Sequence, residues 1–549
     1  MRKILLLVVL AWSFSTTNSQ NAKPVDNKPS FTRPKLVVGI VVDQMRWDFL
    51  YRYTARYKPD GGFKRMLGQG FSCENTFIPY IPTKTACGHT CIYTGSVPAV
   101  HGIVGNEWWD NNLMRDVYCT EDNNAKTVGS TDEAGEMSPR NMLATSICDE
   151  LRLATNFNSK VVGVAIKDRG AILPAGHSAN AAYWFDSKSG YWITSNYYMN
   201  DLPGWVTDLN GKKLYNKYFE GGWNTLYPIN SYAQSTEDVK EYEGKPFGTD
   251  QKGFPYDLKR FIDKNPGAIA VTPFGNSFTL DMAKAALTNE KLGADDFTDF
   301  LAISLSSTDY VGHTFGPNSV EIADTYLRLD QDLGDFLNFL DEKVGKDQYL
   351  VFLSADHGVS QAPGFLKEHN FPGVAVDETR IFRELGLIMK DKFGSDKIID
   401  AYDNSQVYLN HTTIDSLRLN EVAIRKAIIN YFKFRNGVSR IVELDNLGNT
   451  PVPAKIKEMI VNGYFPKRCG DIQVIFDPHW VNVGAVGTSH GMWNPYDSHI
   501  PLLWYGWNIK PGKTNREVYM TDIAPTIAAL LRIQMPSGCI GHVIEEVTK

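Results

Sequence analysis

The sequence of 549 residues has no excess of positive charge and, after its first residues, no long uncharged apolar run. Lys and Arg number 56 against 62 Asp and Glu, which gives a formal net charge of −6. A protein that binds mainly nucleic acid carries a basic surface to neutralise phosphates, so nucleic acid is excluded as the main partner. A membrane-spanning helix needs ~20 consecutive apolar residues, and we therefore expect no membrane span in the mature chain.

Cysteine is scarce, with seven residues in the whole chain and none before Cys73. This absence excludes a bacterial lipid anchor on a cysteine that directly follows a signal peptide. Because seven is odd, at least one thiol stays unpaired within the chain even in an oxidising compartment, and the pairing of the others stays open. Cys87 and Cys91 flank His89, but on a helix the two thiols lie one turn apart with His89 on another face. We interpret them as packed thiols.

The amino terminus has the layout of a secretory signal peptide. Arg2 and Lys3 precede an apolar run from Ile4 to Trp12, and small polar residues follow as far as Ser19. We predict a cleaved signal peptide at 1–20, a polar linker at 21–34 and a catalytic domain at 35–549. The mature protein is expected in the periplasm or outside the cell.

Apolar runs alternate with amphipathic stretches over most of the chain, with no internal repeat and no low-complexity segment. The composition, 43% hydrophobic and 12% aromatic, is sufficient for a large core. Strands of a parallel sheet are predicted at Lys35–Asp43, Lys160–Arg169, Phe300–Asp309, Tyr349–His357 and Ile500–Trp507. Helices are predicted at Pro139–Ala154, Ser277–Lys291, Val320–Val344 and Asp522–Arg532. The pattern predicts an α/β fold, a doubly wound and mostly parallel sheet flanked by helices.

Two regions, about 171–266 and about 358–484, interrupt this alternation. We interpret both as insertions that form a cap over the strand ends, although long aromatic insertions serve equally as structural padding or as a partner surface.

Acidic and histidine side chains follow the predicted strands, where the ligands of such sheets bind. Each alone is ordinary, because a strand-terminal Asp or a single His is more often a cap or a satisfied core group. Together they provide mixed carboxylate and imidazole ligands, which suit Zn²⁺, and two ions about 4 Å apart are a common device for phosphoryl transfer. The candidate metal ligands are Asp43, Asp309, His313, Asp356, His357 and His490. The non-ligands are expected to be His101, His177 and His369.

Thr85 directly precedes a predicted helix over Ala86–Tyr93. Backbone N–H groups and the helix dipole favour an oxyanion or a phosphate at that position, so its hydroxyl is a candidate nucleophile. The structural alternative is an ordinary helix N-cap. Thr83 is the competing hydroxyl, two residues earlier.

Lys167 and Arg169 are two residues apart at the end of a predicted strand, so their side chains are expected to face the same way. A phosphate monoester dianion has more non-bridging charge for these cations than a diester has. The alternative is a pair of solvated surface charges.

Several motifs in order resemble the alkaline phosphatase superfamily, in its branch of nucleotide pyrophosphatases and phosphodiesterases. They are Asp43 after the first strand, PTKTACGHTCIYTG at 82–95, HGIVGN at 101–106, STDYVGH at 307–313, SADHG at 354–358 and GTSHG at 487–491. The resemblance implies that Thr85 is the nucleophile, passing through a phosphothreonine, and that Asn106 is a phosphate ligand.

The Lys-x-Arg pair further resembles the phosphate-irrepressible, threonine-nucleophile alkaline phosphatases of flavobacteria, in which both cations grip the phosphoryl group. That resemblance implies two Zn²⁺ per chain. One would be held by Asp43, Thr85, Asp356 and His357, and the other by Asp309, His313 and His490. The expected protein is therefore an exported, monomeric phosphomonoesterase acting on small phosphate monoesters.

Two alternatives stay open at this point. A phosphodiesterase of the same branch would use the same metals and nucleophile with a pocket for the second ester group. A non-catalytic exported binding protein would use the aromatic insertions for glycans and the metals for structure. A sulfatase of the usual kind is excluded, because no C/S-x-P-x-R motif surrounds Thr85.

Overall fold

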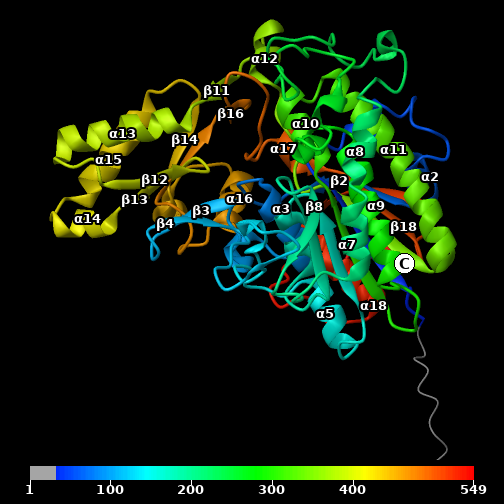
Figure 1. Ribbon diagram of the computed structural model, residues 1–549. Helices are drawn as coiled ribbons and strands as arrows, with labels where there is room; N and C mark the ends of the chain where they lie inside the picture. The colour runs from blue at the N-terminus through cyan, green and yellow to red at the C-terminus, as the bar shows by residue number, and fades with distance from the viewer. Residues whose placement is uncertain (1–31) are drawn as a thin grey trace, which may run out of the picture. The chain divides into compact units, whose positions relative to one another are not determined.

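A mixed sheet of eleven strands lies at the centre of the computed structural model, which describes residues 32–549 (Figure 1). The predicted signal peptide and most of the predicted linker lie outside the described residues. Pro34–Lys549 form one unit. Within residues 32–549, no helix combines the length and apolar character needed to cross a bilayer.

Five neighbouring strands of this sheet are parallel, and their order is β10-β1-β9-β6-β7. They are β1 (Leu36–Val42), β6 (Val161–Ala165), β7 (Ala181–Asp186), β9 (Asp299–Leu305) and β10 (Tyr349–Ser354). All residues of these strands are buried. Burial on both faces explains their nearly continuous apolar sequences and confirms the predicted α/β class.

Further strands complete both edges of the sheet. They are β2 (Phe71–Phe77), β17 (His499–Ile500), β18 (Leu502–Gly506) and β19 (Gly512–Tyr519) on one side, and β5 (Thr127–Val128) and β8 (Tyr191–Ser195) on the other. All of their pairings are antiparallel except that of β19 with β2, which is parallel. The prediction of a parallel strand over Ile500–Trp507 is wrong, because β18 runs antiparallel to both β10 and β2. Its side chains are buried like those of a parallel strand, so the apolar run does not reveal its direction.

Helices flank the sheet in two groups that each pack together. One contains α3 (Thr85–Thr94), α5 (Ile147–Ala154), α6 (Asp168–Ala175) and α18 (Ile523–Leu531). The other contains α2 (Gly62–Gln69), α9 (Phe274–Asn289), α10 (Ser307–Phe315) and α11 (Val320–Leu340). The predicted start of a helix at Pro139 is wrong, because Ser146 and Asp149 form a capping box that begins α5 at Ile147.

The first predicted insertion, about 171–266, is not separate from the sheet. It contains β7, which pairs with β6 in parallel, and β8, which pairs with β7. From the sequence, β7 is not predicted, because its aromatic segment, AAYWFD, lacks the aliphatic run by which the other parallel strands are recognised. Two short helices follow in the same stretch, α7 (Gly204–Gly211) and α8 (Leu214–Glu220).

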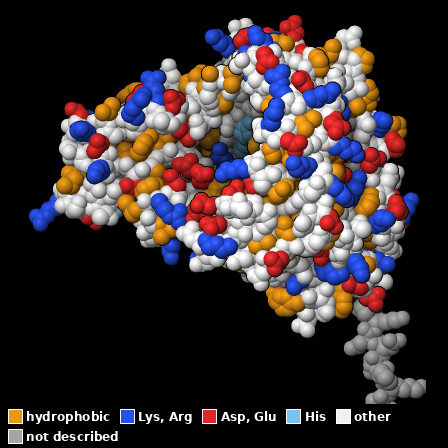
Figure 2. Space-filling view, viewed as in Figure 1, with side chains coloured by type: hydrophobic (Ala, Val, Ile, Leu, Met, Phe, Trp, Pro, Cys, Tyr) orange, Lys and Arg blue, Asp and Glu red, His pale blue; other side chains and the backbone are white. Residues whose placement is uncertain are grey.

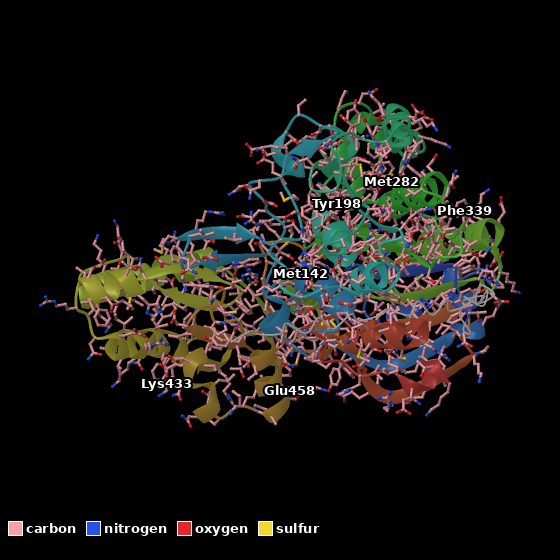
Figure 3. All side chains as sticks on the ribbon, turned by 90° about the horizontal axis from the view of Figure 1, so that it is seen from below. Met142, Tyr198, Met282, Phe339, Lys433 and Glu458 are labelled. Carbon is pink, nitrogen blue, oxygen red and sulfur yellow. The ribbon has the colours of Figure 1, made fainter. Side chains whose placement is uncertain are left out.

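The second predicted insertion, about 358–484, holds a four-stranded sheet with its own apolar core. Its strands are β12 (Ile399–Asp403), β13 (Gln406–Leu409), β14 (Val438–Glu443) and β15 (Ile472–Phe476). Nearby helices are α13 (Glu378–Phe393), α14 (His411–Ser416), α15 (Glu421–Lys433) and α16 (Ala454–Gly463). Figure 3 shows Lys433 and Glu458 on this part of the chain, away from Met282 and Phe339, which belong to helices of the main sheet.

Candidate active site

The carboxyl ends of four parallel strands bring most of the predicted site residues to one edge of the main sheet. In the register of the sheet, Val41 of β1 is paired with Ser354 of β10 and with Ser304 of β9, which is also paired with Ala165 of β6. Asp43 follows β1 directly, and Asp356 lies two residues after β10. Because the strands end in step, residues distant in the sequence lie close together.

The six predicted metal ligands form two groups. Asp43, Asp356 and His357 make one, and their nearest ligand atoms all lie within 4.8 Å of one another. The other group consists of Asp309, His313 and His490, whose nearest ligand atoms also lie within 4.8 Å of one another. Asp309 and His313 are one turn apart on α10, and Nε2 of His313 lies 3.1 Å from Oδ1 of Asp309. The rings of His357 and His490 stack with centroids 3.5 Å apart, so the two groups are adjacent.

All three histidines use Nδ1 for a hydrogen bond to a backbone carbonyl. His313 contacts the oxygen of Thr488 at 2.7 Å, His357 that of Gly358 at 3.0 Å and His490 that of Thr83 at 2.6 Å. A carbonyl only accepts, so Nδ1 carries the proton and the lone pair is on Nε2. Metal-ligating histidines are typically held in this way.

Within the two ligand groups, two buried carboxylate oxygens have no hydrogen-bond partner among residues 32–549: Oδ1 of Asp43 and Oδ2 of Asp356. Burial raises the pKa of Asp43 well above its usual value, and the nearby Asp356 raises it further. An unpartnered buried carboxylate is unfavourable unless a cation neutralises it. Both unpartnered oxygens belong to the first ligand group and fit a divalent cation there, and the second group offers nitrogen and oxygen ligands of the same kind.

Thr85 is the first residue of α3, and its side chain is turned toward the first ligand group. Its Oγ1 lies 3.3 Å from Nε2 of His357, and the residue is 2% exposed. The N-cap of α3 is Lys84, and no side chain caps this helix. The hydroxyl of Thr85 is therefore not a structural cap. The hydroxyl of Thr83 donates to the carbonyl oxygen of Met492 at 3.1 Å instead.

Asn106 lies beside the amino terminus of α3. Its Oδ1 accepts a hydrogen bond from the backbone N–H of Ala86 at 2.9 Å. Because the oxygen faces this donor, the Nδ2 group points elsewhere and is free to donate to an anion bound at the helix terminus.

Lys167 joins the two ligand groups. Its Nζ donates to Oδ2 of Asp43 at 2.7 Å and to Oδ2 of Asp309 at 2.6 Å. Burial opposes its charge, but the two carboxylates outweigh burial and raise the pKa of Lys167. The side chain is only 2% exposed, which contradicts the alternative of a solvated surface charge.

Arg169 lines the same cavity of about 450 Å³ as Lys167. Its Nη1 donates to the hydroxyl of Tyr118 at 2.9 Å, and its buried Nε has no hydrogen-bond partner among residues 32–549. From the sequence, Lys167 and Arg169 are predicted to lie on a strand, where alternate side chains face the same way. This reason for their shared direction is wrong, because β6 ends at Ala165. Lys167 is the N-cap of α6 and Arg169 lies in the first turn of that helix.

Three supporting residues were not found from the sequence. Gln44 donates through Nε2 to Oδ1 of Asp309 at 2.6 Å and through its backbone N–H to Oδ1 of Asp356 at 3.1 Å. Buried His89 lies 3.4 Å from Oδ2 of Asp356, and Tyr118 positions Arg169. The position of Gln44 next to Asp43 in the sequence could have suggested a role at the site. Nothing in the sequence around Tyr118 indicates that this residue contacts Arg169.

The remaining histidines and cysteines lie outside both ligand groups. His101, His177 and His369 belong to neither group. Burial lowers the pKa of His101 to about 3, and Nδ1 of this residue accepts from the backbone N–H of Ile103. Cys87 and Cys91 are buried free thiols, which confirms their interpretation as packed side chains. The other five cysteines are free as well.

Comparison with known proteins identifies the family. The model of the type I phosphodiesterase/nucleotide pyrophosphatase family matches residues 37–497, most of the chain. The chain belongs to this family. It is 52% identical over 552 residues to alkaline phosphatase PhoV of Synechococcus elongatus, covering 99% of each chain. It is 49% identical over 550 residues to alkaline phosphatase PafA of Elizabethkingia meningoseptica, covering 100% of this chain and 99% of PafA.

Two solved structures share the fold described above. The crystal structure of wild-type PafA matches with a TM-score of 0.93 and 50% identity, covering 95% of this chain and 100% of that chain. Murine ectonucleotide pyrophosphatase/phosphodiesterase 5 matches with a TM-score of 0.50 and 14% identity over 91% of this chain and 95% of that one, which shows a shared fold.

Proposed function

We propose that the protein is a metal-dependent phosphomonoesterase, an alkaline phosphatase, that hydrolyses small phosphate monoesters. The observation that carries the proposal is the position of Lys167 and Arg169, which line one cavity beside two groups of potential metal ligands. The roughly 50% identity to two proteins named alkaline phosphatases over nearly their whole lengths supports the same activity.

Thr85 is the proposed nucleophile. Its hydroxyl lies at the amino terminus of α3, where backbone N–H groups favour a developing oxyanion. Attack of Oγ1 on phosphorus expels the alcohol and forms a phosphothreonine. Attack of water on that phosphorus then breaks its bond to Oγ1 and restores Thr85, with inorganic phosphate as the product.

The two ligand groups would hold one Zn²⁺ each, because carboxylate oxygen and imidazole nitrogen are ligands that zinc takes. Asp43, Asp356 and His357, with Thr85, would hold one ion, and Asp309, His313 and His490 the other. When bound, the ions supply Lewis-acid stabilisation of the nucleophile and of the leaving oxygen. Gln44 orients two of the ligands through its hydrogen bonds to Asp309 and Asp356.

Lys167, Arg169 and Asn106 would bind the non-bridging oxygens of the phosphoryl group. The ammonium, the unpartnered Nε of Arg169 and the Nδ2 of Asn106 supply donors for a dianion. A diester has exchanged one of these oxygens for an ester group and would leave part of this buried charge without a partner. The arrangement therefore favours monoesters over diesters.

We further propose that residues 1–20 direct export to the periplasm or the medium, followed by cleavage, and that the mature protein acts as a monomer. The charged, apolar and small-polar order of the first residues supports export.

The direct test compares an aryl phosphate monoester with the matching diester on the zinc-loaded mature protein. We expect kcat/KM for the monoester to exceed that for the diester by about two decades or more, because the diester cannot accept two of the charge-assisted hydrogen bonds. A preference for the diester would instead support the phosphodiesterase alternative, and hydrolysis of neither would support a binding protein.

A further inference from the structure

An acidic cavity opens next to the candidate active site. Its volume is about 870 Å³, and its walls come from β3 (Glu107–Asp110), β4 (Arg115–Tyr118), the start of α13, β12 and residues 482–485. None of its described lining residues is basic, and six of them carry carboxylates. They are Glu107, Asp116, Asp377, Glu378, Asp400 and Asp403.

This acidic cavity shares two of its carboxylates with a smaller cavity that borders the candidate metal site. The smaller cavity, of about 70 Å³, is lined by Glu378 and Asp403 and also by His490 and Lys84. The Nζ of Lys84 donates to the carbonyl oxygen of His490 at 3.4 Å, and Lys84 directly precedes Thr85. Figure 2 shows acidic side chains gathered beside the hollow in which histidine is visible. The alcohol group of a phosphate bound at Thr85 would therefore lie near the carboxylates that the two cavities share.

The described walls of the acidic cavity hold no cation for its carboxylates. Lys84 of the adjoining smaller cavity only partly offsets the rise that burial causes in the pKa of Glu378 and of Asp403, without forming an ion pair with either. Oε2 of Glu378 accepts a hydrogen bond from Asn482 at 2.7 Å, and Oδ2 of Asp403 accepts one from Asn404 at 2.7 Å. No ion pair within 4.0 Å involves either carboxylate in the described part of the chain. Burial and the neighbouring Glu378 raise the pKa of Asp403 to about 7. A bound cation would relieve this repulsion.

Aromatic side chains contribute to the same walls. Trp109, Phe382 and Tyr402 line the cavity. Tyr402 is 8% exposed, and its hydroxyl has no hydrogen-bond partner among residues 32–549. Aromatic faces combined with carboxylates are the surroundings that recognise alkylammonium groups.

We propose that the acidic cavity binds the alcohol portion of phosphate monoesters that carry an ammonium group, so that the enzyme prefers cationic over neutral or anionic alcohols. This inference rests on the proposed phosphomonoesterase function and specifies its substrate class. A nucleotide or sugar phosphate with further anionic groups would be repelled by the same carboxylates.

The test compares phosphocholine with 3,3-dimethylbutyl phosphate, an uncharged ester of nearly the same shape. The ratio of their kcat/KM values is measured for the wild-type enzyme, for Glu378→Gln and for Asp403→Asn. Comparing each variant's ratio with that of the wild type cancels the different reactivity of the two alcohols. Asp391→Asn is the matched control, because it removes one carboxylate charge at an exposed position of α13 outside the cavity.

We expect each cavity variant to lower the phosphocholine to dimethylbutyl ratio about tenfold while hydrolysis of the neutral ester persists. Asp391→Asn should keep the wild-type ratio. An unchanged ratio in both cavity variants, with the neutral ester still hydrolysed, would overturn the inference and leave the proposed function intact. Failure of the wild-type enzyme to hydrolyse either ester would overturn the proposed function and the inference with it.

Discussion

The hydroxyl oxygen of Thr85 lies 3.3 Å from Nε2 of His357, and both side chains are buried. The imidazole is held from its other side by the carbonyl oxygen of Gly358, so its Nε2 lone pair faces the hydroxyl. This relationship places a potential nucleophile at a helix amino terminus and among the ligands of one candidate metal site. A threonine that only capped the helix would direct its hydroxyl toward the backbone instead.

Substitutions at Thr85 should separate the nucleophile from a structural role. Thr85→Ser keeps a hydroxyl and should retain substantial monoesterase activity, whereas Thr85→Ala should lose several orders of magnitude in kcat. Acid quenching of the wild-type reaction, followed by mass spectrometry, should give a phosphorylated peptide that contains Thr85. The matched control is Thr83→Ala, which removes a hydroxyl bonded to Met492. If this control is the inactive variant, Thr85 is not the nucleophile.

Metal content should follow the division into two ligand groups. Elemental analysis of the purified protein should find close to two zinc ions per chain, and His313→Ala should remove mainly one, because His313 belongs to only one group. His369→Ala should keep both ions, since His369 is exposed and outside both groups. Equal loss of both ions from His313→Ala, or fewer than one ion in the wild type, would contradict the assignment.

Gly88 allows α3 to approach Asp356. A Cβ at this position would lie 2.4 Å from the backbone oxygen of Asp356 and 2.6 Å from its Cβ, although alanine is the better helix former. Gly88→Ala should therefore destabilise the protein by about 1–3 kcal/mol in denaturant unfolding and weaken zinc binding. The control Gly386→Ala on α13 has its nearest contact at 3.9 Å and should be neutral or slightly stabilising. If Gly88→Ala instead stabilised the protein, the close packing of α3 against Asp356 would not require a glycine at position 88.

The stability of the protein should depend on the ionisation of Glu243. Burial, and then the nearby Glu321, raises the pKa of Glu243 to about 9, from an ordinary value of 4.5. The folded state therefore holds a proton that the unfolded state releases, so stability should fall as pH rises from about 4.5 to 9. Glu243→Gln should raise Tm at pH 9 more than at pH 5, and Glu241→Gln at an exposed neighbouring position should not. Equal shifts at both pH values would contradict the raised pKa.

Four of the five parallel strands, β1, β6, β9 and β10, and the site residues that follow them could be predicted from the sequence, because burial on both faces gives nearly continuous apolar runs. The run LVVGIVV of β1, for example, is apolar throughout and is followed directly by Asp43. The spacing of Asp309 and His313 also identifies one face of a helix. The direction of β18 could not be predicted, because buried parallel and antiparallel strands have the same composition.

Contacts between distant segments account for what the sequence did not reveal. Tyr118 reaches Arg169 across 51 residues, and Thr488 fixes the ring of His313 from a loop 175 residues away. No periodicity or local spacing encodes such pairs. Lys167 and Arg169 are predicted from the sequence to face the same site, and both line one cavity. The start of α6, and not the end of a strand, places them there.

The most direct test of the phosphomonoesterase assignment is the effect of Lys167→Ala combined with Arg169→Ala on the monoester and diester values of kcat/KM. Removing one charge-assisted hydrogen bond to a buried anion costs about 1.5–3 kcal/mol, or roughly one to two decades in rate. The monoester value should therefore fall by about two decades or more, and the diester value much less. Zinc content measured on the same samples shows whether the metal sites persist without the hydrogen bonds from Lys167 to Asp43 and Asp309. An equal fall for both substrates would contradict the account, because the two cations would then support the fold or the metals and not the dianion of a phosphate monoester.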